Sequence, residues 1–281
     1  MEAAETPLAD YLTLLDTRST TLLAYAADDE TRTAAATWEP SFEQLRERAP
    51  AAADLLSVAA FLAPDDIPRD LFVDNEALPE RLSPLSDALA FADALAALVR
   101  YWLITPTADA FTVHRLVQEI ARERMSDTDE HSWTDTAIHL LDAALPFDDN
   151  DPSTWPATGW LLPHALQACE HAERRQPTPE RASGLLNKSG LYLRRRAQLT
   201  EAQAAYERAL SIDEAAYGPD HPEIAIDVNN LGLVLHERGE LDAAQAAHER
   251  ALQIAEAAHG PDHPLVAAFV SNLGEVLRAQ G

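Results

Sequence analysis

The stretch Tyr217-Gly-Pro-Asp-His-Pro222 returns 42 residues later as His259-Gly-Pro-Asp-His-Pro264. Just upstream of each copy, Glu207-Arg-Ala-Leu210 returns as Glu249-Arg-Ala-Leu252 with the same spacing. Self-similarity at a fixed period is the sequence signature of a repeat array, in which each unit buries its apolar face against its neighbours. The period predicts two full units and the beginning of a third within residues 179–281.

Each unit is expected to be a pair of packed helices. Small residues recur where two helices would approach closely, and bulkier side chains there would push the helices apart. These positions are Gly190, Ala202 and Ala209 in the first unit, and Gly232, Ala244 and Ala251 in the second. In the linking segment, glycine favours the end of one helix, Asp or His can cap the next helix, and proline suits its first turn.

Upstream of the repeats, residues 36–127 have the element order of a winged-helix domain. Helical patterns, the third beginning near Pro68, precede two runs of β-forming residues around a turn at 106–110, and another helix follows. Residues 1–35 are predicted to form an N-terminal helix and linker, and residues 128–178 a helical connector. The predicted fold class is all-α with one small β-hairpin wing: a winged-helix domain, a connector and an α-solenoid.

The repeats resemble the tetratricopeptide repeat, in the 42-residue form found in kinesin light chains and many bacterial regulators. The resemblance implies that the first helix of each unit lines a concave groove that holds an extended protein segment. The groove positions that it implies are Asn187, Asn229 and Ser271 at one level, and Arg194, His236 and Arg278 at another. An asparagine amide donates and accepts at once, so it can bind a peptide backbone. Asn230 and Asn272 are further candidates, with the alternative that they only satisfy neighbouring helices.

The front of the chain resembles the winged-helix part of an NB-ARC-type STAND regulator, through Thr37–Phe42 and Phe111–Gln118. In that family a nucleotide switch precedes this domain and repeats follow it. The resemblance places His114 at a phosphate of bound ADP, although the triplet here is Val113-His114-Arg115 rather than Met-His-Asp. The sequence contains no Gly-x-x-x-x-Gly-Lys-Ser/Thr loop, and its single lysine, Lys188, lies within the repeats. We therefore expect no cofactor, no ATP hydrolysis, and a fragment or degenerate descendant of a longer regulator.

The charge of the chain opposes two classes of partner. Its 21 Lys+Arg against 47 Asp+Glu give a formal charge of −26, which repels nucleic acid and anionic membranes. Within residues 40–127 we count fifteen acidic residues against eight arginines, so DNA binding by the winged helix is disfavoured. The single Cys169, the lack of a long apolar run and the lack of a signal peptide predict a cytoplasmic protein.

Catalytic and metal sites are weakly indicated. His164, Cys169 and His171 form the sole Cys/His cluster, but helical spacing sends Cys169 away from the two histidines. We interpret them as a buried cysteine beside solvated histidines, with no metal site. Carboxylates occur in no recognisable catalytic context, so the chain is not expected to be an enzyme.

These observations predict a protein-protein interaction and sensing module of a signalling regulator. Its partner is a protein or peptide in the groove of the repeats. Two alternatives stay open: an ADP/ATP-dependent regulator in which His114 completes a nucleotide site supplied by another chain or by a missing domain, and a winged-helix transcription regulator. The apolar face of residues Pro264 to Gln280 also predicts self-association, or a continuation of the array beyond Gly281.

Overall fold

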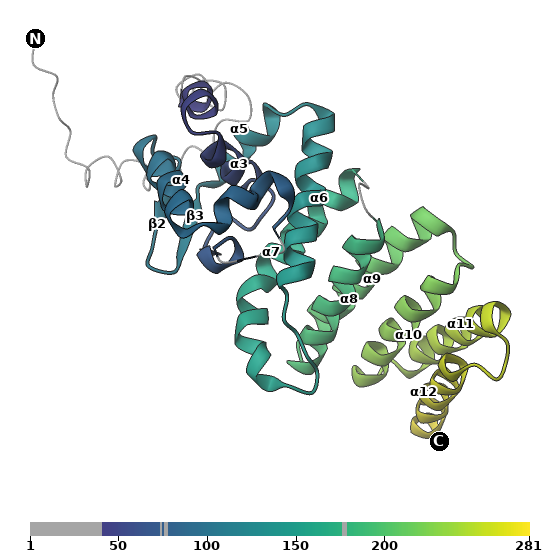
Figure 1. Cartoon of the computed structure of the whole chain (residues 1–281). Coiled ribbons are helices and arrows are strands. Elements are labelled where there is room, and N and C mark those ends of the chain that lie inside the picture. The colour runs from purple at the N-terminus through teal and green to yellow at the C-terminus, as the bar shows by residue number, and fades with distance from the viewer. Residues whose placement is uncertain (1–40, 74, 76–77, 176–178) are drawn as a thin grey trace, which may run out of the picture.

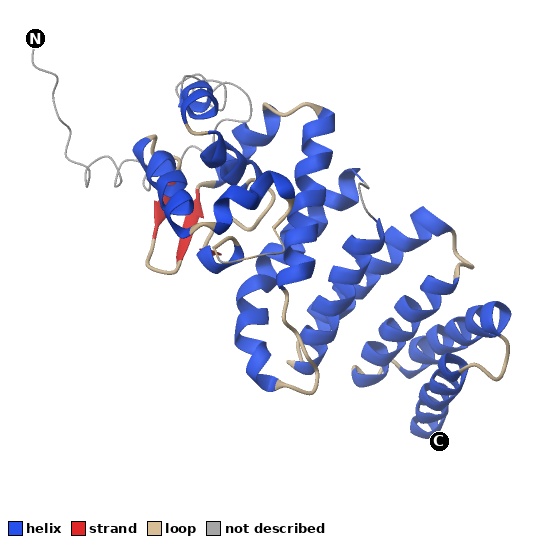
Figure 2. Ribbon diagram, in the orientation of Figure 1, coloured by secondary structure: helices blue, strands red, loops and turns tan. Residues whose placement is uncertain are grey.

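The computed structural model describes residues 41–73, 75, 78–175 and 179–281. Helices dominate these residues, and a small sheet lies near the N-terminal end of the described chain (Figure 1, Figure 2). The predicted class, all-α with a small β element followed by repeated helix pairs, is confirmed. The helix and linker predicted for residues 1–35 fall outside the described residues.

The first part of the described chain has the winged-helix order of elements. A helix over residues 41–48 is followed by α3, β1, the two 3-10 helices η1 and η2, α4, β2, β3 and α5. Their bounds are α3 Pro50–Ala59, β1 Ile67–Pro68, η1 Arg69–Leu71, η2 Glu80–Ser86, α4 Ala88–Arg100, β2 Ile104–Pro106, β3 Ala110–Val113 and α5 Arg115–Glu123.

The sheet has one strand more than the predicted hairpin. Strands β2 and β3 pair antiparallel, with Thr105 opposite Thr112, as the two β-forming runs predict. Strand β1 then pairs with the other edge of β3, with Ile67 opposite Phe111. The predicted start of the third helix near Pro68 is therefore wrong, because that segment is an edge strand followed by a 3-10 turn; the helix itself is α4, which begins at Ala88. Two residues are too few to show a strand period, so the pattern could not reveal β1.

Buried polar contacts fix the end of α3 against α5. The C-terminal carbonyls of a helix have no partner within the helix and must be satisfied from elsewhere. Gln118 is buried, and its Nε2 donates to the carbonyls of Ala59 and Leu62 at 2.8 and 3.0 Å. Arg122 of α5 donates to the carbonyl of Ala60. These bonds position α5 directly after the wing.

The connector is packed into the same core as the winged helix. Helix α6 (Asp127–Ala144) and helix α7 (Trp155–Arg175), with the short η3 (Pro152–Thr154) between them, fill the predicted connector. One hydrophobic cluster runs without a break from Phe42 through these helices to Ile212. Trp160 of α7 also donates from its indole nitrogen to the carbonyl of Asp66 at 2.9 Å. The winged helix, the connector and the first repeat therefore share one core.

The repeats form successive helix pairs, seen in Figure 1 as the stack that leads to the C-terminus. Their helices are α8 Pro179–Arg195, α9 Leu199–Tyr217, α10 Pro222–Glu237, α11 Leu241–His259 and α12 Pro264–Gln280. The small residues expected at the close approaches are buried: Ala202, Ala209, Ala244 and Ala251 have no exposed surface. Helices α8 and α9 form the first unit, α10 and α11 the second, and α12 the start of the third.

Glycine sets the distance between the helices of each unit. A Cβ added to Gly190 would lie 2.8 Å from the ring of Tyr206, and one added to Gly232 would lie 2.7 Å from the ring of His248. Tyr206 and His248 both lie sixteen residues after their glycine. Each unit is therefore closed by an aromatic or imidazole ring that lies on the backbone of its first helix.

The two Gly-Pro-Asp-His-Pro links have the same geometry. Gly218 and Gly260 end their helices with φ of 87° and 83°, a conformation that favours glycine. His221 and His263, rather than the aspartates, cap the following helices by accepting from the backbone N–H two residues ahead. The proline then occupies the first helical position, where no N–H is needed.

No single helix in the described part of the chain is both long and apolar enough to cross a bilayer. One bent pair, η2 with α4, passes by length and composition only.

The ring contact at Gly190 predicts a stability difference between two glycines of one helix. Gly190→Ala should lower the free energy of unfolding by about 1–3 kcal/mol, because the methyl group overpacks the contact with Tyr206. Gly184→Ala is the matched control, since nothing lies within 4 Å of its added Cβ. It should leave stability unchanged or raise it by up to about 1 kcal/mol, as alanine favours helix. Urea unfolding followed by circular dichroism measures both; equal effects would contradict the role of Gly190.

Candidate functional site

Asparagine side chains connect the first helices of successive units. Asn230 Nδ2 of α10 donates to Asn187 Oδ1 of α8 at 3.1 Å, and Asn272 Nδ2 of α12 donates to Asn229 Oδ1 of α10 at 2.9 Å. Asn187 Nδ2 in turn donates to a carboxylate oxygen of Asp227 at 2.6 Å. The equivalent bonds recur with the period of the sequence, so they hold one unit in register with the next.

We call these bonds between asparagines of successive first helices the asparagine ladder. The ladder determines how accessible the predicted asparagine ligands are to a peptide. Asn229 is only 7% exposed, and its Oδ1 also lies 3.2 Å from Nδ1 of the buried His248. Asn187, Asn230 and Asn272 are half-buried and bonded to each other or to acidic and amide neighbours. Their roles as peptide ligands stay predictions, and their inter-repeat bonds are the alternative that the sequence left open for Asn230 and Asn272.

The second predicted level is more accessible towards the C-terminus. Arg194 forms an ion pair with Glu237 of α10 at 2.7 Å, and its side chain is 13% exposed. His236 is half-buried, whereas Ser271 and Arg278 are exposed. Among the described residues, Arg278 bonds within its own helix, to the carbonyl of Gly274 at 3.1 Å. Ser271 and Arg278, followed by the half-buried His236, are therefore the predicted groove residues most accessible to a partner.

An ion pair between second helices also recurs. Arg208 of α9 reaches back to Glu173 of α7 at 2.5 Å, and Arg250 of α11 reaches back to Glu214 of α9 at 2.6 Å. Helix α7 therefore makes the same ion-pair contact with α9 that α9 makes with α11. The connector helices α6 and α7 occupy the place of one more helix pair at the head of the array.

Two parts of the chain match known protein families. Residues 180–254 and 225–281 match the tetratricopeptide repeat (TPR) family. The C-terminal part of the chain is a TPR array. Residues 41–130 match a domain of unknown function, DUF7779. This second match covers the winged helix and the start of α6.

Solved structures with a similar fold include a bacterial protein. The crystal structure of BtubC (BKLC) from P. vanneervenii is similar over 90% of this chain and 85% of that chain, at 16% sequence identity and a TM-score of 0.42. No curated protein matches the chain.

A buried carboxyl pair lies where the first TPR unit meets the second. Asp213 of α9 and Asp227 of α10 are both buried and lie against each other, with Ser183 and Asn187 as hydrogen-bond partners. Burial raises the pKa of Asp227 to about 7; the charge of Asp213 adds to the rise, and the bond from Asn187 opposes it. Burial also raises the pKa of Asp213. The sequence alone does not reveal this pair, because many carboxylates in the chain share its local pattern.

The Cys/His cluster is buried throughout, which corrects the expectation of solvated histidines. His164 is 1% exposed and Cys169 is fully buried, its Sγ bonded to the carbonyl of Ala182. Burial raises the pKa of Cys169 to about 12, so this thiol does not act as a nucleophile near neutral pH. His171 packs edge-on against Phe61, and burial with the nearby Arg122 lowers its pKa to about 4. Helix α7 uses both histidines as core side chains.

His114 serves a local structural purpose. It is exposed and caps α5, with its Nδ1 accepting from the N–H of Leu116 at 3.2 Å. A phosphate contact would have to be made by the other ring nitrogen while this cap is intact. The nucleotide role of His114 stays a prediction.

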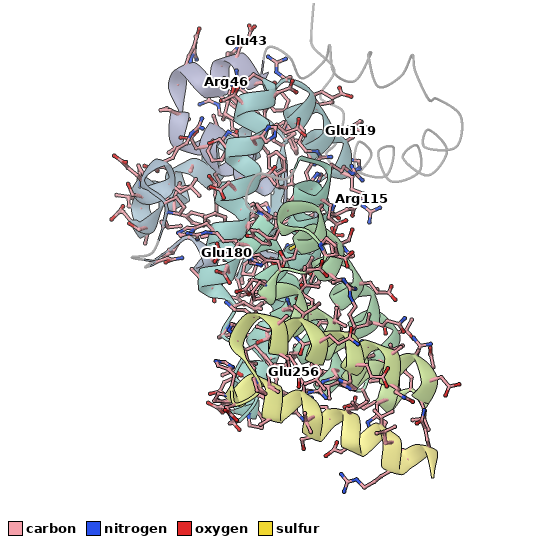
Figure 3. The ribbon with its side chains drawn as sticks, turned by 90° about the vertical axis from the view of Figure 1, so that its right-hand side faces the viewer. Glu43, Arg46, Arg115, Glu119, Glu180 and Glu256 are labelled. Carbon is pink, nitrogen blue, oxygen red and sulfur yellow. The ribbon has the colours of Figure 1, made fainter. Side chains whose placement is uncertain are left out.

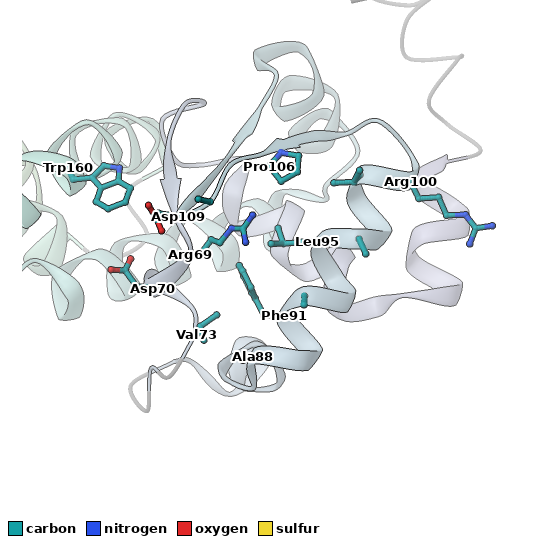
Figure 4. Close-up of a pocket in the computed structure, with 14 residues that line it drawn as sticks. Arg69, Asp70, Val73, Ala88, Phe91, Leu95, Arg100, Pro106, Asp109 and Trp160 are labelled. Atoms are coloured by element: carbon teal, nitrogen blue, oxygen red, sulfur yellow. The ribbon is translucent and has the colours of Figure 1, made fainter. Parts of the chain in front are cut away.

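The exposed face of α4 is apolar where a DNA-reading helix would be basic. Leu89, Ala92, Ala96 and Val99 follow helical spacing along this face, and Leu89 is 71% exposed. Beside it lies a hollow of about 890 Å³, lined by α4, by Arg69, and by Trp160 across from them (Figure 4). Such a face suits contact with protein better than contact with phosphate.

The carboxyl pair predicts a pH dependence of stability. Folding raises the pKa of Asp227 from 3.8 to about 7, so the folded state keeps a proton that the unfolded state loses. The contribution of this proton is present at low pH and is lost as the pH rises through these values. Asp227→Asn keeps an oxygen for Asn187 without the charge. The variant should exceed the natural chain in unfolding free energy near pH 8, by on the order of 2 kcal/mol, with a smaller gap near pH 4.

Urea unfolding at several pH values measures this difference, and Asp220→Asn, at an exposed position, is the matched control. Taking the difference between variant and natural chain removes the opposite effect of the buried His164, His171 and His248, whose pKa values are lowered by burial. A gap that does not widen as the pH rises would contradict the buried carboxyl pair.

Proposed function

We propose that the chain is a protein-interaction and sensing module, and that its TPR array binds an extended segment of a partner protein along the first helices α8, α10 and α12. The observation that carries the proposal is the array itself, a stack of units whose register is fixed by side-chain bonds between first helices. A rigid stack offers a preformed surface, so most of the conformational entropy lost on binding comes from the bound segment and not from the array.

The exposed residues of the first helices define the chemistry of the site. Ile226 is 39% exposed on α10, and His236 and Arg278 lie further along their helices near the acidic Glu237 and Glu275. This mixture favours a segment with an apolar side chain between polar ones. The asparagine amides of the ladder can hydrogen-bond to the backbone of the bound segment through those donors and acceptors that the ladder itself does not use.

We further propose that this module works within a STAND-type signalling regulator. The order of a winged helix, a helix pair and TPR units supports this, together with the shared core that joins them. In this mechanism, a partner on the array shifts the packing of α6 and α7, which the winged helix contacts directly. The chain binds and transmits, and it carries out no catalysis.

The peptide site predicts a loss of binding without loss of fold. We would select ligands for the full chain from a phage library of random extended peptides and measure their affinity by calorimetry. His236→Ala with Arg278→Ala should weaken the selected peptides about tenfold. These residues are chosen because Asn229 and Arg194 are buried or paired, so their replacement would also disturb the array.

Arg115→Ala, at an exposed position of α5 outside the array (labelled in Figure 3), is the control that removes an arginine. It should leave peptide affinity unchanged. Peptides that bind the double variant as tightly as the natural chain would place the site elsewhere and refute this function for the first helices.

The alternative nucleotide function predicts a direct signal. If His114 completes a phosphate site in this chain, calorimetry with ADP or ATP, with and without Mg²⁺, should detect micromolar binding that His114→Ala abolishes. Our proposal predicts no heat in any of these titrations, because the sequence contains no Gly-x-x-x-x-Gly-Lys-Ser/Thr loop that would cradle the phosphates. Nucleotide binding that requires His114 would overturn the proposal that this chain binds a protein partner and no nucleotide.

A further inference from the structure

The junction between the first and the second TPR unit is closed by polar side chains, whereas the next junction is apolar. Both junctions share the same link, the same histidine cap and an equivalent asparagine bond. They differ in the side chains buried where the helices meet. Ser183, Asp213 and Asp227 of the first junction correspond to Ala225, Ala255 and Phe269 of the second, each 42 residues later. The three later residues are buried in one hydrophobic cluster, so the carboxyls replace an apolar contact at the first junction.

The two carboxyls are enclosed and incompletely hydrogen-bonded. Asp213 is 5% exposed and Asp227 is 1% exposed. Within the described part of the chain, Oδ1 of Asp213 and Oδ2 of Asp227 have no hydrogen-bond partner, and no basic side chain forms an ion pair with either residue. Two like charges in contact at this depth repel strongly, because little solvent screens them. The closed junction therefore needs a proton on the pair.

The groups bonded to the pair or beside it act on this proton in both directions. Burial raises the pKa of both carboxyls, and the charge of Glu223, in the first turn of α10, adds to the rise. Ser183 and Asn187 of α8 and His221 of the link act in the opposite direction and do not cancel the rise. The balance favours the protonated pair up to about neutral pH.

The other charged groups near this junction do not neutralise the pair. Glu180 of α8, labelled in Figure 3, and Tyr217 at the end of α9 add acidic groups to the same region. Arg250 of α11 reaches this end of α9, but it pairs with Glu214 at 2.6 Å and donates to the carbonyl of Pro219 at 3.1 Å. Loss of the proton therefore leaves two like charges with no countercharge bonded to either.

We propose that Asp213 and Asp227 form a proton-controlled joint, which holds the first two TPR units together when it is protonated and lets them part at this junction when it is ionised. Each unit of a repeat array contacts only its neighbours, so one junction can open while the helix pairs on both sides stay folded. Opening brings water to both carboxylates and relieves their repulsion at a lower cost than the unfolding of either unit. Ala255 and Phe269 at the second junction have no ionisable group that responds in this way.

The joint is connected to the asparagine ladder through Asn187. Its Nδ2 donates to Asp227, and its Oδ1 accepts from Nδ2 of Asn230. Separation of the units at this point breaks the link between α8 and α10 and changes the alignment of these two first helices. A segment bound along both helices should therefore bind more weakly when the pair is ionised. This consequence rests on the proposed function, whereas the opening of the junction does not.

Hydrogen exchange of the full chain, followed by mass spectrometry, tests the joint with an internal control. Protection factors, which divide out the intrinsic effect of pH on exchange, are compared between about pH 6 and about pH 8.5. The equivalent segments are residues 209–228 and 251–270. The first segment should lose protection at least about tenfold, because the raised pKa of the pair is crossed in this range, and the second should change little. An equal loss in both segments would show that pH acts on the whole fold and would overturn the joint.

Two variants assign the effect to the pair. Asp213→Ala with Asp227→Phe gives the first junction the side chains of the second, and Asp227→Asn removes one charge at nearly constant volume. Both should reduce the loss of protection in residues 209–228 to that of the second segment. Asp220→Asn, at an exposed position of the link, should keep the full loss. If the double variant does not fold, Asp227→Asn decides alone, and a tenfold loss that persists in it would overturn the proposal.

Peptide affinity separates the joint from the proposed function. Peptides selected on the array should bind the natural chain more weakly at the higher pH, and this difference should be absent in Asp227→Asn. Failure of any peptide to bind would refute the proposed function, while the exchange measurement still decides the joint. Equal affinity at both pH values with an open junction would refute the connection between the joint and the first helices.

Discussion

The close contact between a glycine backbone and a ring is the constraint on which the repeat array depends. At Gly190 and Gly232 the ring of Tyr206 or His248 occupies the space that any other residue would need for its Cβ. This contact fixes the separation of the two helices of a unit, and the buried alanines beside it extend the same separation along the helices. Once the helix pair has a fixed shape, its neighbours stack on it, and the asparagine ladder and the arginine-glutamate pairs then form at each step and hold the register.

The two kinds of inter-repeat contact have different consequences. The ladder ties first helices together through amides that are largely withdrawn from solvent, so it contributes rigidity more than recognition. The ion pairs join second helices nearer the surface, where each contributes little alone. The ion pairs also show which helices are equivalent. Because Arg208 of α9 pairs with Glu173 of α7 as Arg250 of α11 pairs with Glu214 of α9, helices α6 and α7 continue the array into the winged helix. The shared core from Phe42 to Ile212 is the packing counterpart of that continuity, and it gives a physical path between the two ends of the molecule.

Buried polar groups lie both between units of the array and within one unit. The carboxyls of Asp213 and Asp227 lie at the boundary of two units, and His248 lies beneath Gly232 with its ring bonded to Asn229. Such groups add less to stability than apolar residues of similar size, and they give each interface a specific partner. A solenoid built from near-identical helices needs that specificity, because apolar faces alone would tolerate slippage by one turn.

The repeat period, the helix pairs, the glycine and alanine positions, and the hairpin could all be predicted from sequence, because each depends on a local pattern or on self-similarity. The strand at Ile67 and Pro68 could not, since it exists only by pairing with Phe111 and Ala110. The burial of His164 and His171 was likewise decided by helices packed around α7, which turn an apparently polar helix inward. The candidate ligands Asn187 and Asn229 follow from the sequence as positions, but whether an amide faces a peptide or a neighbouring asparagine depends on distances between units. Sequence fixes what each helix can contribute, and only the stacking of helices decides which of those groups are left for a partner.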